Sequence, residues 1–164
     1  MDASNWIAVS AILANIITGV VAYLWGKRDE KLNRIVEHDR TVWARLDAAL
    51  PYNDLKGFLD TLDDGYFLRE AGVKVAVFQR LFREPENEFL APTLRASSLE
   101  FFGALRTMRE YVGVNFSSKD SGGDHIWLHS EKKDSARVEF LPLIEGVEKC
   151  YLNLRAAVKE ELKV

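Results

Sequence analysis

The pattern of polar positions begins with a long stretch that carries no charge. No Asp, Glu, Lys or Arg occurs between Asp2 and Lys27. A helix over residues 6–26 would be about 30 Å long, which is the thickness of a bilayer's hydrocarbon core. No Lys or Arg precedes the apolar run, unlike in a secretory signal peptide, and a buried core helix rarely lacks charge over such a span. The pattern predicts a single transmembrane helix over 6–26, after a short tail over 1–5.

Aromatic and basic residues mark the two ends of this predicted span. Trp6 stands at one end, and Tyr23 and Trp25 stand at the other, as expected for rings that favour the headgroup boundary. Lys27 and Arg28 follow the span, and basic residues collect on the cytoplasmic side. We therefore expect a single-pass protein of a bacterial inner membrane, with the N-terminus outside and the C-terminus in the cytoplasm.

Small residues recur along one side of the predicted span. Close backbone approach over such residues and interhelical hydrogen bonds drive helix association in bilayers. The middle of the span also holds Asn15, whose amide would lack water there. We expect homo-oligomerisation through this face, although a monomer that tolerates one amide is the alternative. The predicted contact residues are Ser10, Ala11, Ala14, Asn15, Thr18, Gly19 and Ala22.

A membrane-proximal helix is predicted over residues 27–50, and it ends before Pro51. Its apolar positions recur at intervals of three and four, which is typical of a coiled coil or of a bundle helix. The seam consists of Leu32, Ile35, Asp39, Val42, Leu46 and Ala49. Asp39 has two interpretations, a polar residue paired across an interface or a solvated position beside an apolar stripe through Val36 and Trp43. We favour the interpretation of Asp39 as a solvated position.

The remaining region, residues 51–164, is predicted to be a cytoplasmic α-helical domain. Breakers separate amphipathic segments, so the fold class is all-α, with a helical bundle of four to five helices after the membrane span. The expected elements are a short helix that ends near Asp63, a helix over 66–82, a loop over 83–91, a helix from Pro92 to about Val112, a mobile connection over 115–124, and a last helix that ends near Leu162.

Composition and charge narrow the classes of partner. The net charge is −3, and the largest basic groups are pairs such as Lys132 and Lys133, so no nucleic-acid partner is expected. The single Cys150 excludes an intrachain disulfide and is interpreted as a buried structural thiol. The sequence has no phosphate-binding loop and no nucleophile motif, so it predicts no cofactor and no catalytic residues.

Two features remain as candidate sites. His125 and His129 stand four residues apart and would be metal ligands on one face of a helix, but no third ligand is identified, so exposed histidines near Trp127 are the favoured interpretation. Phe101 and Phe102 are adjacent, so on a helix they point about 100° apart. That helix should contact two neighbours, or one neighbour and a protein partner.

These observations favour a protein that works by binding. The expectation is a membrane-anchored oligomeric scaffold, adaptor or regulatory subunit with an unknown cytoplasmic protein partner and contacts to membrane lipid. The alternative is a membrane-active effector whose spans assemble and perturb the bilayer in response to a cytoplasmic signal. A membrane-anchored hydrolase ranks third, since no convergent catalytic set is present.

Overall fold

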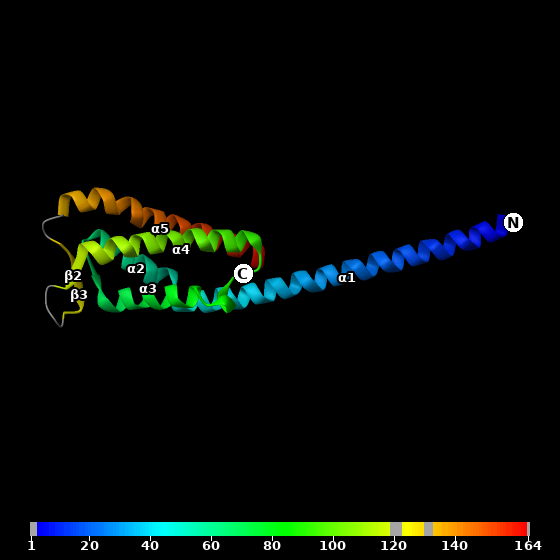
Figure 1. The fold of residues 1–164 in the computed structure, drawn as a ribbon, viewed down its shortest axis with the longest axis horizontal. Coiled ribbons are helices and arrows are strands. Elements are labelled where there is room, and N and C mark those ends of the chain that lie inside the picture. The colour runs from blue at the N-terminus through cyan, green and yellow to red at the C-terminus, as the bar shows by residue number, and fades with distance from the viewer. Residues whose placement is uncertain (1–2, 119–122, 130–132, 164) are drawn as a thin grey trace. The chain divides into compact units, whose positions relative to one another are not determined.

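The fold is helical with one small sheet (Figure 1). The structure is a computed structural model that describes the backbone of residues 3–118, 123–129 and 133–163. Side chains are described for residues 18–117, 123–129 and 138–163. Contacts divide the chain into two units, Met1–Glu37 and His38–Val164, and the helix α1 (Ala3–Ala49) contributes to both.

The first unit is helical. All of its described side chains from Thr18 to Arg34 are exposed. Lys27 places its Nζ 4.9 Å from the ring centroid of Tyr23, one helical turn away. Glu30 and Arg34 form an ion pair at 2.5 Å across the next turn.

The predicted membrane span receives no support from this structure. Within the part of the chain that the structure describes, no helix combines the length and the apolar character that a bilayer crossing needs. The side chains of residues 6–17, which make up more than half of the predicted span, lie outside the described residues.

The second unit is a helical bundle, which confirms that part of the predicted fold class. Pro51 separates α1 from α2 and occupies the N-cap of α2. The bundle helices are α2 (Tyr52–Asp63), α3 (Arg69–Phe82), α4 (Pro92–Asn115) and α5 (Lys133–Leu162), with a short 3-10 helix, η1 (Pro85–Asn87), between α3 and α4. Pro92 stands in the first turn of α4, as predicted, where its missing N–H would have no helical partner.

The core forms where the apolar faces of these helices meet. The α4 positions predicted from three- and four-residue spacing are all buried: Leu94, Ser98, Phe101, Leu105, Met108 and Val112. Phe101 contacts Tyr151 of α5 and Phe78 of α3, with ring centroids 5.0 and 5.6 Å apart. Among the described residues, α4 packs extensively against α5. Cys150 of α5 is only half-buried, so the expected buried thiol lies at the edge of this core.

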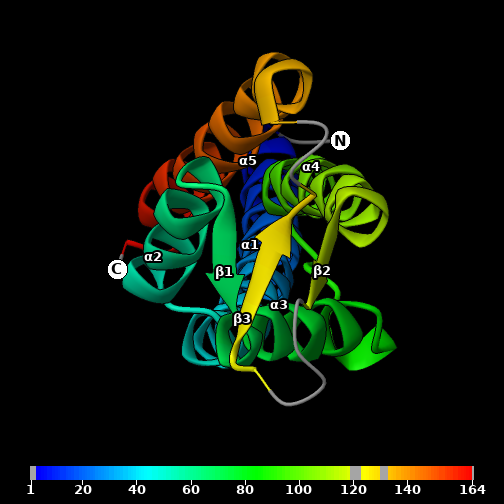
Figure 2. The ribbon, with the colours of Figure 1, turned by 90° about the vertical axis from the view of Figure 1, so that its left-hand side faces the viewer.

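A three-stranded antiparallel sheet closes one end of the bundle (Figure 2). Its order is β1 (Tyr66–Leu68), β3 (His125–Leu128), β2 (Phe116–Ser118), with Phe67 opposite Ile126 and Phe116 opposite Leu128. Phe67, Leu128 and Phe116 are buried, so the inner face of the sheet completes the core.

The sheet differs from the predicted elements in two segments. The helix predicted over 66–82 starts only at Arg69, because Tyr66–Leu68 pairs with β3. The connection predicted over 115–124 contains β2, in which Phe116 is only 7% exposed, and residues 119–122 lie outside the described residues. Strands of three or four residues are too short to show a period of two, so their pairing is not visible in the sequence.

Candidate functional site

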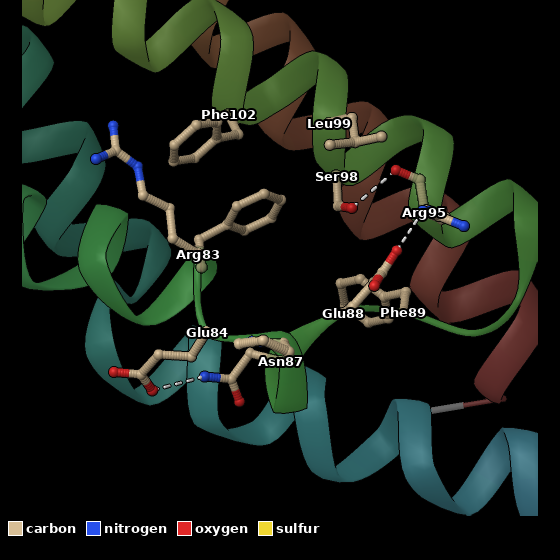
Figure 3. A pocket seen from close by; sticks show the side chains of 11 residues that line it. Arg83, Glu84, Asn87, Glu88, Phe89, Arg95, Ser98, Leu99 and Phe102 are labelled. Atoms are coloured by element: carbon tan, nitrogen blue, oxygen red, sulfur yellow. Dashed lines mark hydrogen bonds and ion pairs between the residues drawn. The ribbon is translucent and has the colours of Figure 1, made fainter.

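A pocket of about 390 Å³ opens where α3 ends and α4 begins (Figure 3). We call it the loop pocket, because the segment that joins these two helices forms much of its wall. It is lined by Phe82, Arg83, Glu84, Pro85, Asn87, Glu88, Phe89, Arg95, Ser98, Leu99 and Phe102. Its volume lies at the lower end of the range for small-molecule sites.

Aromatic rings form the apolar part of the loop pocket. Phe82 of α3 and Phe102 of α4 are stacked, with centroids 4.5 Å apart and planes 10° apart. Phe89 is only 2% exposed, whereas Leu99 is 55% exposed at the rim. The pocket therefore offers an apolar surface that water reaches from one side.

Charged groups surround this apolar surface. The Arg83 guanidinium lies 5.6 Å from the centroid of the Phe102 ring, within the range of a cation–π contact. Arg95 forms an ion pair with Glu88 on the opposite side of the pocket (Figure 3). Glu84 accepts a hydrogen bond from the Asn87 amide at 3.3 Å. Two cations and two anions thus ring the pocket, and their charges balance.

The wall of the loop pocket is fixed by a buried asparagine. The Nδ2 of Asn87 also donates to the carbonyl oxygen of Leu81 at 2.8 Å, which ties η1 to the end of α3. Its Oδ1 accepts a longer bond of 3.5 Å from Arg45 of α1. Since Asn87 is 2% exposed, these bonds hold the loop in one conformation without competition from water.

Asp39 of α1 holds the other end of the same loop. The Oδ1 of Asp39 accepts a hydrogen bond from the backbone N–H of Leu90 at 2.8 Å, and Oδ2 accepts one from Ala91 at 2.9 Å. These N–H groups directly precede α4, where the helix dipole also favours a negative charge. Asp39 is 0% exposed, so the interpretation as a solvated position is wrong. We call this contact the Asp39 clasp.

His38 adds a third link from α1 to the wall of the loop pocket. Its Nε2 lies 3.0 Å from the carbonyl oxygen of Glu88, so the imidazole donates to the loop in the tautomer that carries the proton on Nε2. His38, Asp39 and Arg45 therefore support the 84–91 segment from one helix, although none of them lines the pocket.

The two phenylalanines predicted as a partner surface separate in the structure. Phe101 is 0% exposed and belongs to the core with Phe78 and Tyr151. Phe102 is half-buried and lines the loop pocket. Of the predicted pair, only Phe102 is therefore placed to meet a ligand.

The two candidate metal ligands do not converge. His125 lies in β3, where its ring stacks on Trp127 at 5.8 Å, and the Nε2 of His129 lies 2.9 Å from the Ser117 hydroxyl. A strand rises about 3.3 Å per residue, so positions four apart are separated by about 13 Å. Within the described residues, no group of three metal-ligating side chains comes together.

The residues predicted for self-association lie partly outside the described part of the chain. The side chains of Trp6, Ser10, Ala11, Ala14 and Asn15 belong to the residues that are not described. The remaining predicted positions are exposed on α1: Thr18, Gly19, Ala22, Tyr23, Trp25, Lys27 and Arg28. Among the described residues, no atom lies within 4 Å of a Cβ added at Gly19.

The loop pocket has the chemistry of a binding site. Its lining, as far as the chain is described, supplies aromatic rings, two guanidinium groups and two carboxylates, but no Cys or His. No family model, curated protein or solved structure matches this chain. The lining residues themselves therefore indicate what the pocket can bind.

Proposed function

We propose that this chain is a membrane-anchored, oligomeric helical scaffold, adaptor or regulatory subunit that acts by binding a protein partner at the loop pocket. The observation that carries the proposal is the half-open aromatic surface of the pocket, ringed by charges of both signs. Binding hot spots commonly combine a buried apolar anchor with surrounding polar contacts. An aromatic or aliphatic side chain of the partner fits this description, with charged neighbours placed to meet Arg83 and Glu84.

The fixed geometry of the pocket wall supports the same proposal. The Asp39 clasp and the Asn87 bonds hold the 84–91 segment before any ligand arrives. A preorganised surface loses less conformational entropy on binding, which raises affinity. The clasp also links the wall of the pocket to α1. A regulatory subunit would need such a link to couple ligand binding at the pocket to α1.

A photo-crosslinking experiment tests the binding site. The variant Leu99→p-benzoylphenylalanine places a reactive group at the rim of the loop pocket in the full chain, in living cells. Leu152→p-benzoylphenylalanine is the matched control, because Leu152 is a similarly exposed leucine of α5 that does not line the pocket. We expect a discrete adduct from position 99 only, and its loss on adding Phe102→Ala. Identical adducts from both positions would contradict the proposal.

The membrane anchor is supported by the charge-free sequence over 6–26 and needs its own test. Leu13→Lys combined with Ile16→Lys introduces two charges, each of which costs about 3 kcal/mol at a bilayer centre. We expect this variant to leave the membrane pellet after high-speed sedimentation. Leu13→Phe combined with Ile16→Phe keeps the apolar character and should still pellet. If wild type stays in the supernatant without detergent, the anchor, its orientation and the membrane localisation are wrong.

Self-association is tested at the small-residue face. Asn15→Leu combined with Gly19→Leu removes an amide and a site of close approach, so a membrane two-hybrid signal should weaken. Val20→Leu, on the bulky side of the same helix, should leave the signal unchanged. Dye leakage from vesicles that contain the wild-type chain would instead favour the membrane-active effector.

A further inference from the structure

A second pocket lies at the opposite end of the α3 and α4 pair, next to the sheet. We call it the sheet-end pocket. It has a volume of about 350 Å³ and is lined by Phe58, Phe67, Arg69, Gly72, Val73, Val75, Ala76, Arg109, Val112, Gly113 and Ile126. None of these residues belongs to the loop pocket, so a ligand bound here would be independent of the proposed function.

The walls of the sheet-end pocket are apolar and firmly placed. Phe58, Phe67, Val75 and Val112 are each 9% exposed or less. Gly72 is what lets the Phe67 ring lie against α3, because a Cβ at this position would come within 2.8 Å of the Phe67 Cε2. The apolar wall therefore belongs to the folded core and is present without a ligand.

Two guanidinium groups are the only charged groups among the described residues of the lining. Arg69 begins α3, and Arg109 lies on α4. No Asp or Glu of the described ranges stands beside them in the lining. This differs from the loop pocket, where Glu84 and Glu88 balance two arginines.

Both arginines have only uncharged acceptors within the part of the chain that the structure describes. The Nη1 of Arg109 donates to the Gln79 Oε1 at 2.5 Å, and the Nη2 of Arg69 donates to the Gly123 carbonyl oxygen at 3.3 Å. By contrast Arg106, one turn before Arg109, forms an ion pair with Glu110 at 2.8 Å. The two guanidinium groups of the sheet-end pocket keep further N–H groups that can donate hydrogen bonds to a carboxylate.

Gln79 contacts Arg109 from a buried position. Gln79 is 3% exposed, and its Nε2 is buried without a hydrogen-bond partner among the described residues. The amide oxygen of Gln79 is turned toward Arg109 and accepts the hydrogen bond from its guanidinium.

We infer that the sheet-end pocket binds a small organic carboxylate with a flat or short apolar body. The apolar body would lie against Phe67, Val75 and Val112, and the carboxylate would accept hydrogen bonds from Arg69 and Arg109. Guanidinium forks match the geometry of a carboxylate, which favours a monoanion of this kind over a neutral ligand. The volume of the pocket suits a ligand of one or two fused rings.

Isothermal titration of the full chain with 2-naphthoate tests this inference, with 2-naphthamide as the neutral ligand of the same shape. We expect the naphthoate to bind about tenfold more tightly or better, because charge-assisted hydrogen bonds are lost with the amide. Arg69→Gln combined with Arg109→Gln should abolish this preference. Arg80→Gln combined with Arg106→Gln removes the same charge from the same two helices outside the pocket and should keep it.

A variant that fills the sheet-end pocket with a larger side chain keeps the test decisive if the double arginine variant does not fold. Gly113 lines the pocket, and a Cβ there meets no described atom within 4 Å, so Gly113→Leu should fold and occupy the site while both arginines remain. We expect it to lose naphthoate binding. Equal binding of naphthoate and naphthamide by wild type, or unchanged naphthoate binding by Gly113→Leu, would overturn the inference.

Discussion

The helix α1 contains two regions that share one sequence pattern and differ in burial. Leu32 and Leu46 both lie on the predicted seam, yet Leu32 is 49% exposed and Leu46 is 2% exposed. Asp39 lies between them in sequence and is fully buried. Regular spacing therefore identifies the face that a helix can bury, whereas a partner from elsewhere in the chain decides which turns of that face are buried.

The largest expected effect comes from removing the buried carboxylate of α1. Asp39→Ala takes the acceptor from two backbone N–H groups, and hydrogen bonds to a charged group contribute about 1.5–3 kcal/mol each, so we expect a loss of about 3–6 kcal/mol. The urea midpoint followed by circular dichroism measures this loss.

Asp29→Ala is the matched control for the Asp39 clasp. Asp29 is an exposed carboxylate of the same helix, and its removal should leave the midpoint close to that of wild type. Equal shifts for the two variants would show that the clasp contributes nothing to stability. A crosslink from position 99 that survives Asp39→Ala would show that the clasp is not needed to form the loop pocket.

The same substitution at Leu32 and Leu46 should have very different effects on stability. Leu46→Ala should destabilise the fold by about 2–5 kcal/mol, because it removes methyl groups from a packed core. Leu32→Ala should change stability by less than about 0.5 kcal/mol, since exposed positions lose little packing. Thermal unfolding of both variants at several protein concentrations measures the pair. A large, concentration-dependent effect of Leu32→Ala would show that the seam continues into a coiled coil between chains.

Much of the bundle can be predicted from local spacing. The buried positions of α4 and those of α5 from Ile144 to Val158 follow intervals of three and four, so the sequence pattern alone identifies them correctly. The limits of α3 and the sheet are not predictable in this way. Tyr66 pairs with Trp127, sixty-one positions away, and no local pattern records such a partner.

The candidate site is less predictable than the fold. The sequence pattern identifies only one lining residue of the loop pocket, Phe102. It does so because Phe101 and Phe102 are adjacent aromatic residues on one predicted helix. Phe89 lies in a segment that resembles a polar loop, although a lone aromatic residue just before a helix that begins with Pro92 is a signal for burial. The prediction for Asp39 is wrong because a carboxylate on an apolar seam is solvated unless distant backbone N–H groups reach it, as those of Leu90 and Ala91 do.

A smaller effect than that of Leu46→Ala is expected for a tyrosine that contacts the bundle part of α1. Tyr151 is 2% exposed, and its hydroxyl donates to the Asp47 Oδ1 at 3.2 Å. Burial raises the pKa of Tyr151 to about 12, and the carboxylate of Asp47 adds to this, while the Arg155 guanidinium opposes it. In the unfolded chain the pKa is about 10, so the folded state retains a proton that the unfolded state releases.

This difference in proton binding fixes the direction of the pH dependence. The contribution of Tyr151 to stability is fully present below pH 10 and falls as the pH rises from about 10 to about 12. We expect Tyr151→Phe to unfold about 1 kcal/mol more easily at pH 8, through the lost hydrogen bond, and to show a shallower decline above pH 10. Urea midpoints at pH 8, 10 and 11.5 measure both effects. Tyr23→Phe, at a 61% exposed position of the same protein, should follow wild type at every pH. Parallel curves for wild type and Tyr151→Phe would show that the hydroxyl ionises equally in the folded and unfolded states, which would contradict the prediction.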